Sequence, residues 1–289
     1  KQLPFWLFTI SVYVAIVIIF LLIGILSWFY ATTWFSYIPT DFSYSAQINS
    51  VDYLYDEEKG HFPVSPILAK TTFSYQVVSR EGQALIIQNS FKAYKPGSAR
   101  EKIFAVERLY GIDRKTGEHV PGSGDRDRAG YLFAPKRMDR LAGQHHQYSY
   151  WHVNYDASAP MEFAGEENIF GLRVHRHQAN YTADQTVNLN HLPGVPESRG
   201  VTLFPSLTIW IEPTTGRMIK YEDDTIAYYY NITTGELLHP WNKFHNEFSE
   251  NSIIEQVRIA KNLKLLHFLL KTILPVITLG ISLLVLILY

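Results

Sequence analysis

The sequence from Leu3 to Tyr30 reads LPFWLFTISVYVAIVIIFLLIGILSWFY and contains no charged side chain. A helix of about 20 apolar residues is long enough to cross the hydrocarbon core of a bilayer, and this run is longer. A second uncharged run, from Thr272 to Tyr289, ends the sequence with TILPVITLGISLLVLILY. We therefore expect two transmembrane helices that bracket one polar domain.

The first run is interpreted as an uncleaved anchor. It is longer than the apolar region of a signal peptide, which spans about 7–15 residues, and no small-x-small cleavage site follows it. Aromatic side chains flank both of its ends, as expected for rings that lie at the headgroup level. The residues expected at the membrane interface are Trp6, Trp28, Tyr30, Trp34, Arg258, Lys261, Lys264 and Lys271.

The pattern divides the chain into three parts. Residues 1–38 are expected to form the N-terminal transmembrane helix with an aromatic interfacial segment, and residues 39–250 a β-rich domain. Residues 251–289 are expected to form an amphipathic helix that continues into the C-terminal transmembrane helix.

Composition excludes several classes of function. The 289 residues include no cysteine, which rules out thiolate catalysis, cysteine-ligated zinc, iron–sulfur clusters and disulfides. With 26 basic and 27 acidic residues the formal net charge is −1, so no global field attracts nucleic acid, and none is expected as a partner. The lipid bilayer and other membrane-protein subunits, or further copies of the chain, are the expected partners.

Charge leaves the orientation in the membrane open. Four basic residues, Arg258, Lys261, Lys264 and Lys271, precede the second run on its domain side, whereas Lys1 stands at the other end of the first run. Read literally, the positive-inside rule places the domain in the cytoplasm, but long domains translocate largely regardless of their charge.

From Asp41 onward, apolar and polar residues alternate, as in Thr72–Val77, which predicts β-strands. The same pattern predicts strands over residues 45–55, 84–94, 102–110, 147–155, 169–177, 201–212, 218–222 and 225–230. The domain is therefore expected to be mainly antiparallel β with few helices, either a sandwich or a strongly curved sheet, which makes the fold class α+β.

One turn pattern recurs between the predicted strands, with an acidic residue or Asn followed by Gly four residues later. It is found at Asp56–Gly60, Asp113–Gly117, Glu212–Gly216, which contains Pro213, and Asn231–Gly235. The side-chain oxygen can accept hydrogen bonds from the turn backbone, and Gly can take the left-handed conformation, so these are predicted hairpin tips. Residues 121–130 and 191–200 are instead expected to be flexible polar loops.

Several histidines are candidate metal ligands. His175 and His177 lie on one face of a predicted strand, and His152 or His191 would supply a third ligand. A solvated strand face is the favoured alternative, because Arg173 shares that face. Residues 125–130 resemble a calcium loop only in part, since a closing glutamate is missing and arginines alternate with the carboxylates.

No catalytic motif is found. The sequence lacks the nucleophile elbow, the phosphate-binding loops and the His-Glu-x-x-His pattern. The acidic pairs Glu166-Glu167 and Asp223-Asp224 are expected to be solvated turn carboxylates, because neighbours on a strand point to opposite faces. We expect neither enzymatic activity nor a cofactor.

Ser252-Ile-Ile-Glu255 predicts a capping box, so a helix is expected from Ser252 to Tyr289 with a possible kink at Pro275. The spacing of Thr278 and Ser282 would let helices approach closely, which leaves oligomerisation or docking to another membrane protein open. Neither run contains an ionisable residue in its apolar core, which argues against an ion pathway.

The central block resembles the porin-PorA-like family of archaeal and actinobacterial membrane-anchored proteins, long catalogued as a domain of unknown function. The resemblance lies in ERLYGIDRKTG (107–117), GYLFAP (130–135), YSYWHV (148–153), NIFGLRV (168–174) and LTIWIEPTTG (207–216). Glu212 stands where the family pattern has aspartate. The resemblance implies an extracytoplasmic, periplasmic or extracellular, domain between two spans, and the family name implies a channel.

Three functions remain open at this point. The preferred prediction is an accessory or scaffold subunit of a membrane assembly. The alternatives are the sensor input domain of a signalling protein that continues past Tyr289, and a subunit of an oligomeric pore.

Overall fold

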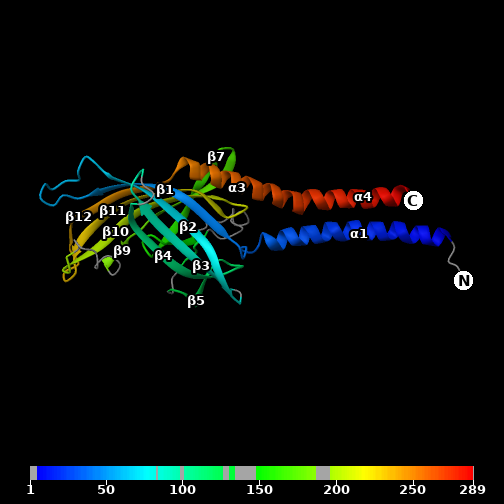
Figure 1. Ribbon diagram of the computed structural model, residues 1–289, viewed down its shortest axis with the longest axis horizontal. Coiled ribbons are helices and arrows are strands. Elements are labelled where there is room, and N and C mark those ends of the chain that lie inside the picture. Colours follow the sequence, from blue (N-terminus) through cyan, green and yellow to red (C-terminus); the bar gives the residue numbers. More distant parts are fainter. Residues whose placement is uncertain are drawn as a thin grey trace. The chain divides into compact units, whose positions relative to one another are not determined.

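The computed structural model describes residues 5–82, 84–97, 101–125, 130–133, 148–186 and 196–288. The chain forms two compact units, a helical unit of Lys1–Pro39 with Ile259–Tyr289 and a β unit of Thr40–Arg258. Figure 1 shows the terminal helices and, between them in the sequence, a mainly antiparallel sheet. The predicted α+β class, with two apolar helices bracketing the β domain, is confirmed.

The helices begin and end as follows. They are α1 (Phe5–Trp34), α3 (Glu250–Phe268), the π-helical turn η2 (Leu269–Ile273) and α4 (Leu274–Leu288). By length and composition, Val12–Thr33 and Glu250–Leu288 are both able to cross a membrane.

Small residues bring α1 and α4 together. Thr278 and Ser282 are 3% and 2% exposed. The Ser282 hydroxyl donates to the carbonyls of Thr278 (2.9 Å) and of Val17 on α1 (3.4 Å). A Cβ added to Gly24 would collide with the Thr278 hydroxyl. The small-residue face with Thr278 and Ser282, which the sequence predicted as a surface for oligomerisation or docking to another membrane protein, therefore pairs α4 with α1 of the same chain.

A widened turn lies just before Pro275, the position at which the sequence predicted a possible kink. In η2 the N–H of Leu274 donates to the carbonyl of Leu269, five residues back. The next bond in that register would need the N–H of residue 275, which proline lacks. The Leu270 carbonyl that is left over accepts the hydroxyl of Ser27 from α1.

The β unit is one curved sheet (Figure 1). Its strands are β1 (Ser43–Leu54), β2 (Ile67–Glu81), β3 (Ala84–Tyr94), β4 (Lys102–Asp113), β5 (His119–Gly124), β6 (Tyr148–His152), β7 (Ala157–Ile169), β8 (Leu172–Asn180), β9 (Ala183–Asp184), β10 (Arg199–Glu212), β11 (Arg217–Asn231) and β12 (Leu237–Phe248). Their order is β5-β4-β3-β2-β1-β12-β11-β10-β8-β7-β6, with β9 beside β10, and all the pairs are antiparallel.

The recurring turn has the expected geometry at each of its four positions. Asp113 Oδ1 accepts the N–H groups of Lys115 (2.8 Å) and Thr116 (2.6 Å), and Gly117 has φ +78°. The equivalent bonds are made by Asp56, Glu212 and Asn231, and Gly60, Gly216 and Gly235 all have φ between +70° and +73°. Pro213 occupies the second position of the turn that joins β10 to β11.

The two ends of the sheet approach each other across its inner face, the face whose side chains are buried. Tyr131 forms a bridge to Tyr150 of β6 and donates its hydroxyl to Glu118, beside β5. Arg108 of β4 donates to the carbonyl of Val153, just after β6 (2.7 Å). The segment after β6 therefore covers the inner face of the opposite end of the sheet.

Several strands differ from the prediction. The expected strands over 218–222 and 225–230 form one strand, β11, that runs through Asp223-Asp224 without a turn. β7 and β12 were missed because their prolines, glycine and charged residues obscure the alternation. Residues 121–124 belong to β5 and not to a loop, whereas residues 126–129 and 191–195 lie outside the described residues.

The predicted capping box is wrong. α3 begins at Glu250. The carbonyl of Ser249 accepts a hydrogen bond from the N–H of Ile253, and the hydroxyl of Ser249 accepts one from the N–H of Ser252. Ser252 Oγ accepts the N–H of Gln47 of β1 (2.7 Å). Ser249 is thus the cap, and the hydroxyl that was expected to cap the helix attaches its first turn to the sheet.

We expect Gly24→Ala to weaken the pairing of α1 with α4 by about 1–3 kcal/mol, the usual cost of overpacking. Gly280→Ala is the matched control, because nothing lies within 4 Å of a Cβ at that position. The measurement is an SDS titration of the purified chain, followed by fluorescence transfer between dyes on α1 and α4. Thr278→Ala should partly rescue Gly24→Ala, and equal effects of the two glycine substitutions would contradict the packing described above.

Candidate functional site

The β unit contains a partly open cavity of about 240 Å³. Its walls are the inner faces of β1–β4 and β12, and Val153–Tyr155, here called the roof segment, covers it. The polar lining comprises Ser50, Asp52, Thr71, Asn89, Arg108, Asn154, Asn242 and Asn246, and the aromatic rings are those of Phe91, Tyr155 and Phe244. The cavity is therefore apolar in part, with several amide groups and one carboxylate.

Three residues of the lining, Asn89, Asn154 and Arg108, direct hydrogen-bond donors to the protein itself. Asn89 Nδ2 donates to the carbonyl of Ser74 (3.2 Å), and Asn154 Nδ2 to the hydroxyl of Tyr221 (3.3 Å). The Arg108 guanidinium donates to Val153 and lies 3.4 Å from a carboxylate oxygen of Asp156.

The lining has open acceptors. Asn154 Oδ1 and Asn242 Oδ1 are buried and have no hydrogen-bond partner among the described residues. Asp52, on β1 beside Phe244 of β12, lines the same cavity. Burial alone raises the pKa of its carboxyl to about 6, because desolvation disfavours the charged form.

A buried polar network lies behind the roof segment. The ring nitrogens of His152 lie 2.5 Å and 2.7 Å from the hydroxyls of Tyr181 and Tyr221. Burial lowers the pKa of His152 to about 3, so the ring is neutral at physiological pH and one tyrosine donates to it while the other accepts. His152 thus orients tyrosines.

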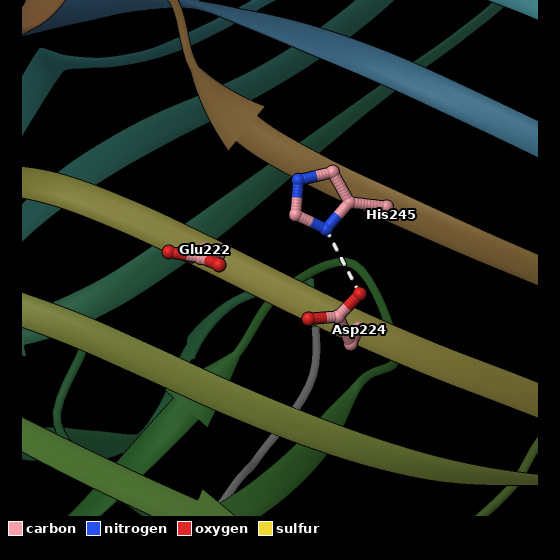
Figure 2. Close-up of side chains that lie close together, drawn as sticks. All are labelled: Glu222, Asp224 and His245. Atoms are coloured by element: carbon pink, nitrogen blue, oxygen red, sulfur yellow. Dashed lines mark hydrogen bonds and ion pairs between the residues drawn. The ribbon is translucent and has the colours of Figure 1, made fainter.

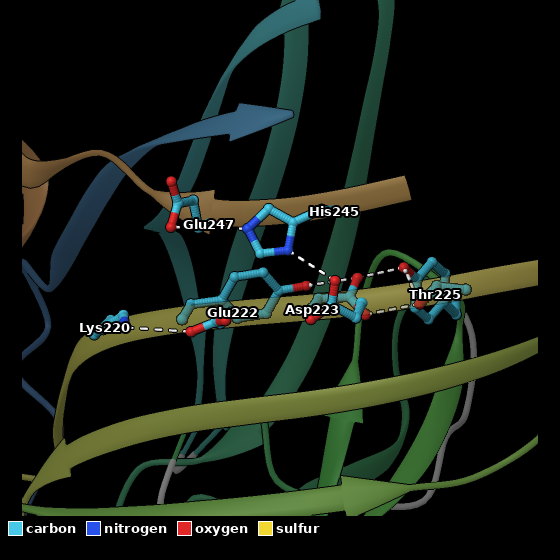
Figure 3. Close-up of polar contacts among 9 residues, drawn as sticks. Lys220, Glu222, Asp223, Thr225, His245 and Glu247 are labelled. Carbon is cyan, nitrogen blue, oxygen red and sulfur yellow. Dashed lines mark hydrogen bonds and ion pairs between the residues drawn. The ribbon is translucent and has the colours of Figure 1, made fainter. Parts of the chain in front are cut away.

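Asp223 holds the roof segment. Its carboxylate is 0% exposed and accepts the hydroxyls of Tyr155, Tyr221 (3.3 Å) and Thr225 (2.8 Å) (Figure 3). Burial raises its pKa to about 6, although these bonds and one with Asn246 act in the opposite direction. The prediction that Asp223 is a solvated turn carboxylate is wrong, because it lies on the inward side of β11.

A second titratable cluster lies on the opposite, outer face of β11 and β12. Glu222 and Asp224 of β11 stand opposite Glu247 and His245 of β12. Ligand atoms of Glu222, Asp224 and His245 lie within 4.8 Å of one another (Figure 2). Three carboxylates and an imidazole are donors that suit a divalent transition metal.

The groups of this cluster already have partners. His245 Nδ1 lies 2.9 Å from Asp224, and its Nε2 3.7 Å from Glu247. Lys220 Nζ lies 3.2 Å from Glu222 (Figure 3). Burial lowers the pKa of His245, but its bond to Asp224 and the surrounding carboxylates outweigh burial and raise it. We therefore interpret the cluster as an ion-pair network.

The predicted metal candidates do not meet at one point. His175 and His177 lie on a buried face of β8, 5% and 2% exposed, and not on a solvated one. His175 Nε2 lies 3.3 Å from Glu166, and neither nitrogen of His177 has a hydrogen-bond partner among the described residues. Burial and the neighbouring His175 lower the pKa of His177 to about 4. His152 is bonded to tyrosines, and His191 and most of the loop 125–130 lie outside the described residues.

The predicted interfacial residues lie on the helices. Trp28 and Tyr30 of α1 are 49% and 57% exposed, and Trp6 and Trp34 are on the same helix. Arg258, Lys261 and Lys264 belong to α3, where Arg258 bonds Glu255 (2.6 Å), and Lys271 lies in η2.

Sequence reasoning missed Asp52, Asp223 and the cavity, although a signal was present. Tyr44, Ala46, Ile48 and Ser50 alternate in β1, and Asp52 continues their buried face. Asp223 likewise lies in phase with Tyr221 and Thr225. In both strands, a carboxylate occupies a position at which the alternation places the buried side chains, and this was the sequence signal for a buried carboxylate.

Comparison with protein families finds that the family described as Porin PorA matches residues 10–289. The chain therefore belongs to this family, as its sequence motifs predicted. Comparison with curated proteins finds no match. A crystal structure of an N-terminal dehydratase from the difficidin assembly line is 10% identical over 74% of this chain and 82% of that chain, with a TM-score of 0.12, which is too low to carry an argument.

We expect Asp52→Asn to stabilise the β unit at pH 7.5 by roughly 1–2 kcal/mol. This is less than the full shift in the pKa of Asp52 implies, because the carboxyl is partly solvated. The folded-state pKa, about 6, lies above the ordinary value of 3.8. Stability contributed by protonated Asp52 is therefore present below pH 4 and lost as the pH rises through 6.

Thermal unfolding of the wild type and of Asp52→Asn at pH 4 and pH 7.5 measures this difference. Asp41→Asn, at an exposed position, is the control. Comparing variants at each pH is necessary, since His152, with its lowered pKa, makes the stability rise with pH over an overlapping range. A destabilised Asp52→Asn at pH 7.5 would contradict the assignment.

Proposed function

We propose that this member of the Porin PorA family is a non-enzymatic, two-pass membrane protein that binds a small ligand in its β unit as an accessory subunit of a membrane assembly. The supporting observation is the cavity of about 240 Å³, whose lining leaves buried acceptors open. Ligand pockets are typically lined by apolar and aromatic groups with a few placed polar groups, which matches this lining.

The absence of catalysis belongs to the same proposal. Among the described residues, the histidine close to the roof segment is His152. It is neutral, and its two ring nitrogens form hydrogen bonds with tyrosine hydroxyls. Asp223 is surrounded by donors within the protein. Neither group is free to take a proton from a substrate, so we assign them to the support of the cavity.

The polar groups of the paired helices favour an anchor over a pore. Ser27, Thr278 and Ser282 all donate to carbonyls of the helical unit. A water-filled path normally presents polar or charged groups to its lumen. A sensor input domain would use the same ligand cavity, and it remains the alternative to the accessory subunit.

We place the β unit outside the cytoplasm, on the strength of the family resemblance. This leaves the cavity accessible to a periplasmic or extracellular ligand. The basic residues of α3 would then lie near the outer leaflet.

The ligand is tested by filling the cavity. Ala69 of β2 lines it, and Ala69→Phe should lower the occupancy of a co-purifying ligand at least tenfold in native mass spectra of the detergent-solubilised chain. Ala105→Phe, at an exposed position of β4, is the matched control and should retain the ligand. A wild type without any bound small molecule, or equal occupancy in the two variants, would count against the proposal.

The orientation is tested with single cysteines, which the cysteine-free chain makes straightforward. Glu58→Cys lies in the exposed tip between Asp56 and Gly60 and should react with a membrane-impermeant maleimide in intact cells. Gln2→Cys should react only after permeabilisation. The reverse pattern would place the β unit in the cytoplasm.

A further inference from the structure

We infer that the ligand of the cavity carries a primary ammonium group, held by Asp52, and belongs to the small alkylammonium compounds such as linear diamines. This inference rests on the proposed function, since it names the ligand class of the same cavity. It is carried by two unpartnered hydrogen-bond acceptors, by an uncompensated charge and by aromatic rings in the same lining.

The first argument is that two buried acceptors of the lining lack a donor. Asn89, Asn154 and Arg108 direct donors to Ser74, Tyr221 and Val153, within the protein. Asn154 Oδ1 and Asn242 Oδ1 are buried and unpartnered among the described residues. A ligand that satisfies these oxygens must supply N–H or O–H groups, and an ammonium group supplies three.

The second argument is charge. Arg108, the basic residue of the lining, is compensated by Asp156 at 3.4 Å and by the carbonyl of Val153. Asp223, behind the roof segment, is surrounded by hydroxyl donors. Asp52 makes no ion pair with any described residue, and burial raises its pKa, which is the signature of a carboxylate that lacks a cation.

The third argument is the surroundings of that carboxylate. Phe244 stands directly opposite Asp52 in the pairing of β1 with β12, and the rings of Phe91 and Tyr155 line the same cavity. Aromatic faces attract a cation through their quadrupole, and desolvation strengthens this attraction. An anionic ligand would instead face an unpaired carboxylate, and a neutral polyol would leave its charge uncompensated.

The test is calorimetric titration of the full-length chain in detergent at pH 7.5 with 1,5-diaminopentane. The matched probes are 1,5-pentanediol, which keeps the length and replaces the ammonium groups by hydroxyls, and glutarate, which reverses the charge. We expect saturable binding of the diamine, at least tenfold tighter than that of either matched probe. Lowering the pH to 5 should weaken binding of the diamine, because Asp52 becomes protonated.

Two test variants and one control variant assign the site. Asp52→Asn should weaken diamine binding at least tenfold, while Asp41→Asn should leave it unchanged. Thermal unfolding shows that each variant is folded, and Ala69→Phe should abolish binding independently of charge. Equal binding of diol and diamine, or diamine binding unaffected by Asp52→Asn, would overturn the inference.

The experiment separates this inference from the proposed function. If the diamine does not bind but a co-purifying ligand is still displaced by Ala69→Phe, the ligand class is wrong and the cavity remains a binding site. If no ligand co-purifies and none of the probes binds, both proposals fail.

Discussion

The β unit depends on the carboxylate of Asp223. Desolvating an ionised carboxylate is costly unless donors surround it, and here Tyr155, Tyr221, Thr225 and Asn246 bond to it. Tyr155 belongs to the roof segment, so the bond that satisfies the carboxylate also fixes the cover of the cavity. His152 extends the network to Tyr181 beyond β8. The position of the roof segment thus depends on how one buried charge is accommodated.

The sequence predicted the local structure well wherever a single residue sets the backbone. Asp113 and Gly117 required nothing from distant parts of the chain, because the acceptor and the left-handed glycine lie within one turn. β12 could not be predicted in this way: it contains Pro240, Asn242 and Asn246, which are poor strand formers, and it is held by its neighbours β1 and β11. Tertiary pairing, which propensity does not encode, made it a strand.

The candidate site was missed for the same reason. Asp223 and Asp224 read as a polar interruption of a strand, since one of the hydroxyls that stabilise Asp223, that of Tyr155, comes from a residue 68 positions away. The helical unit shows the converse case. Proline at position 275 predicted an irregularity from local chemistry, but only the structure shows that Ser27 supplies the donor for the carbonyl of Leu270. In both cases the sequence did not reveal the distant hydrogen-bond partner, which is Tyr155 for Asp223 and Ser27 for the carbonyl of Leu270.

The neighbours Asp223 and Asp224 also explain why two carboxylate clusters on the same strands differ in chemistry. Alternation along β11 sends Asp224 and Glu222 to the outer face, where His245 and Lys220 pair with them and solvent screens what remains. The same alternation in β1 sends Asp52 to the inner face, where partial burial reduces the screening and donors of Asn89 and Arg108 are already bound within the protein. An exposed cluster gains little from an additional cation, because it is already compensated. A partly buried, unpaired carboxylate gains both a charge partner and hydrogen bonds, so the selectivity for a cationic ligand that we propose follows from which face of its strand the carboxylate occupies.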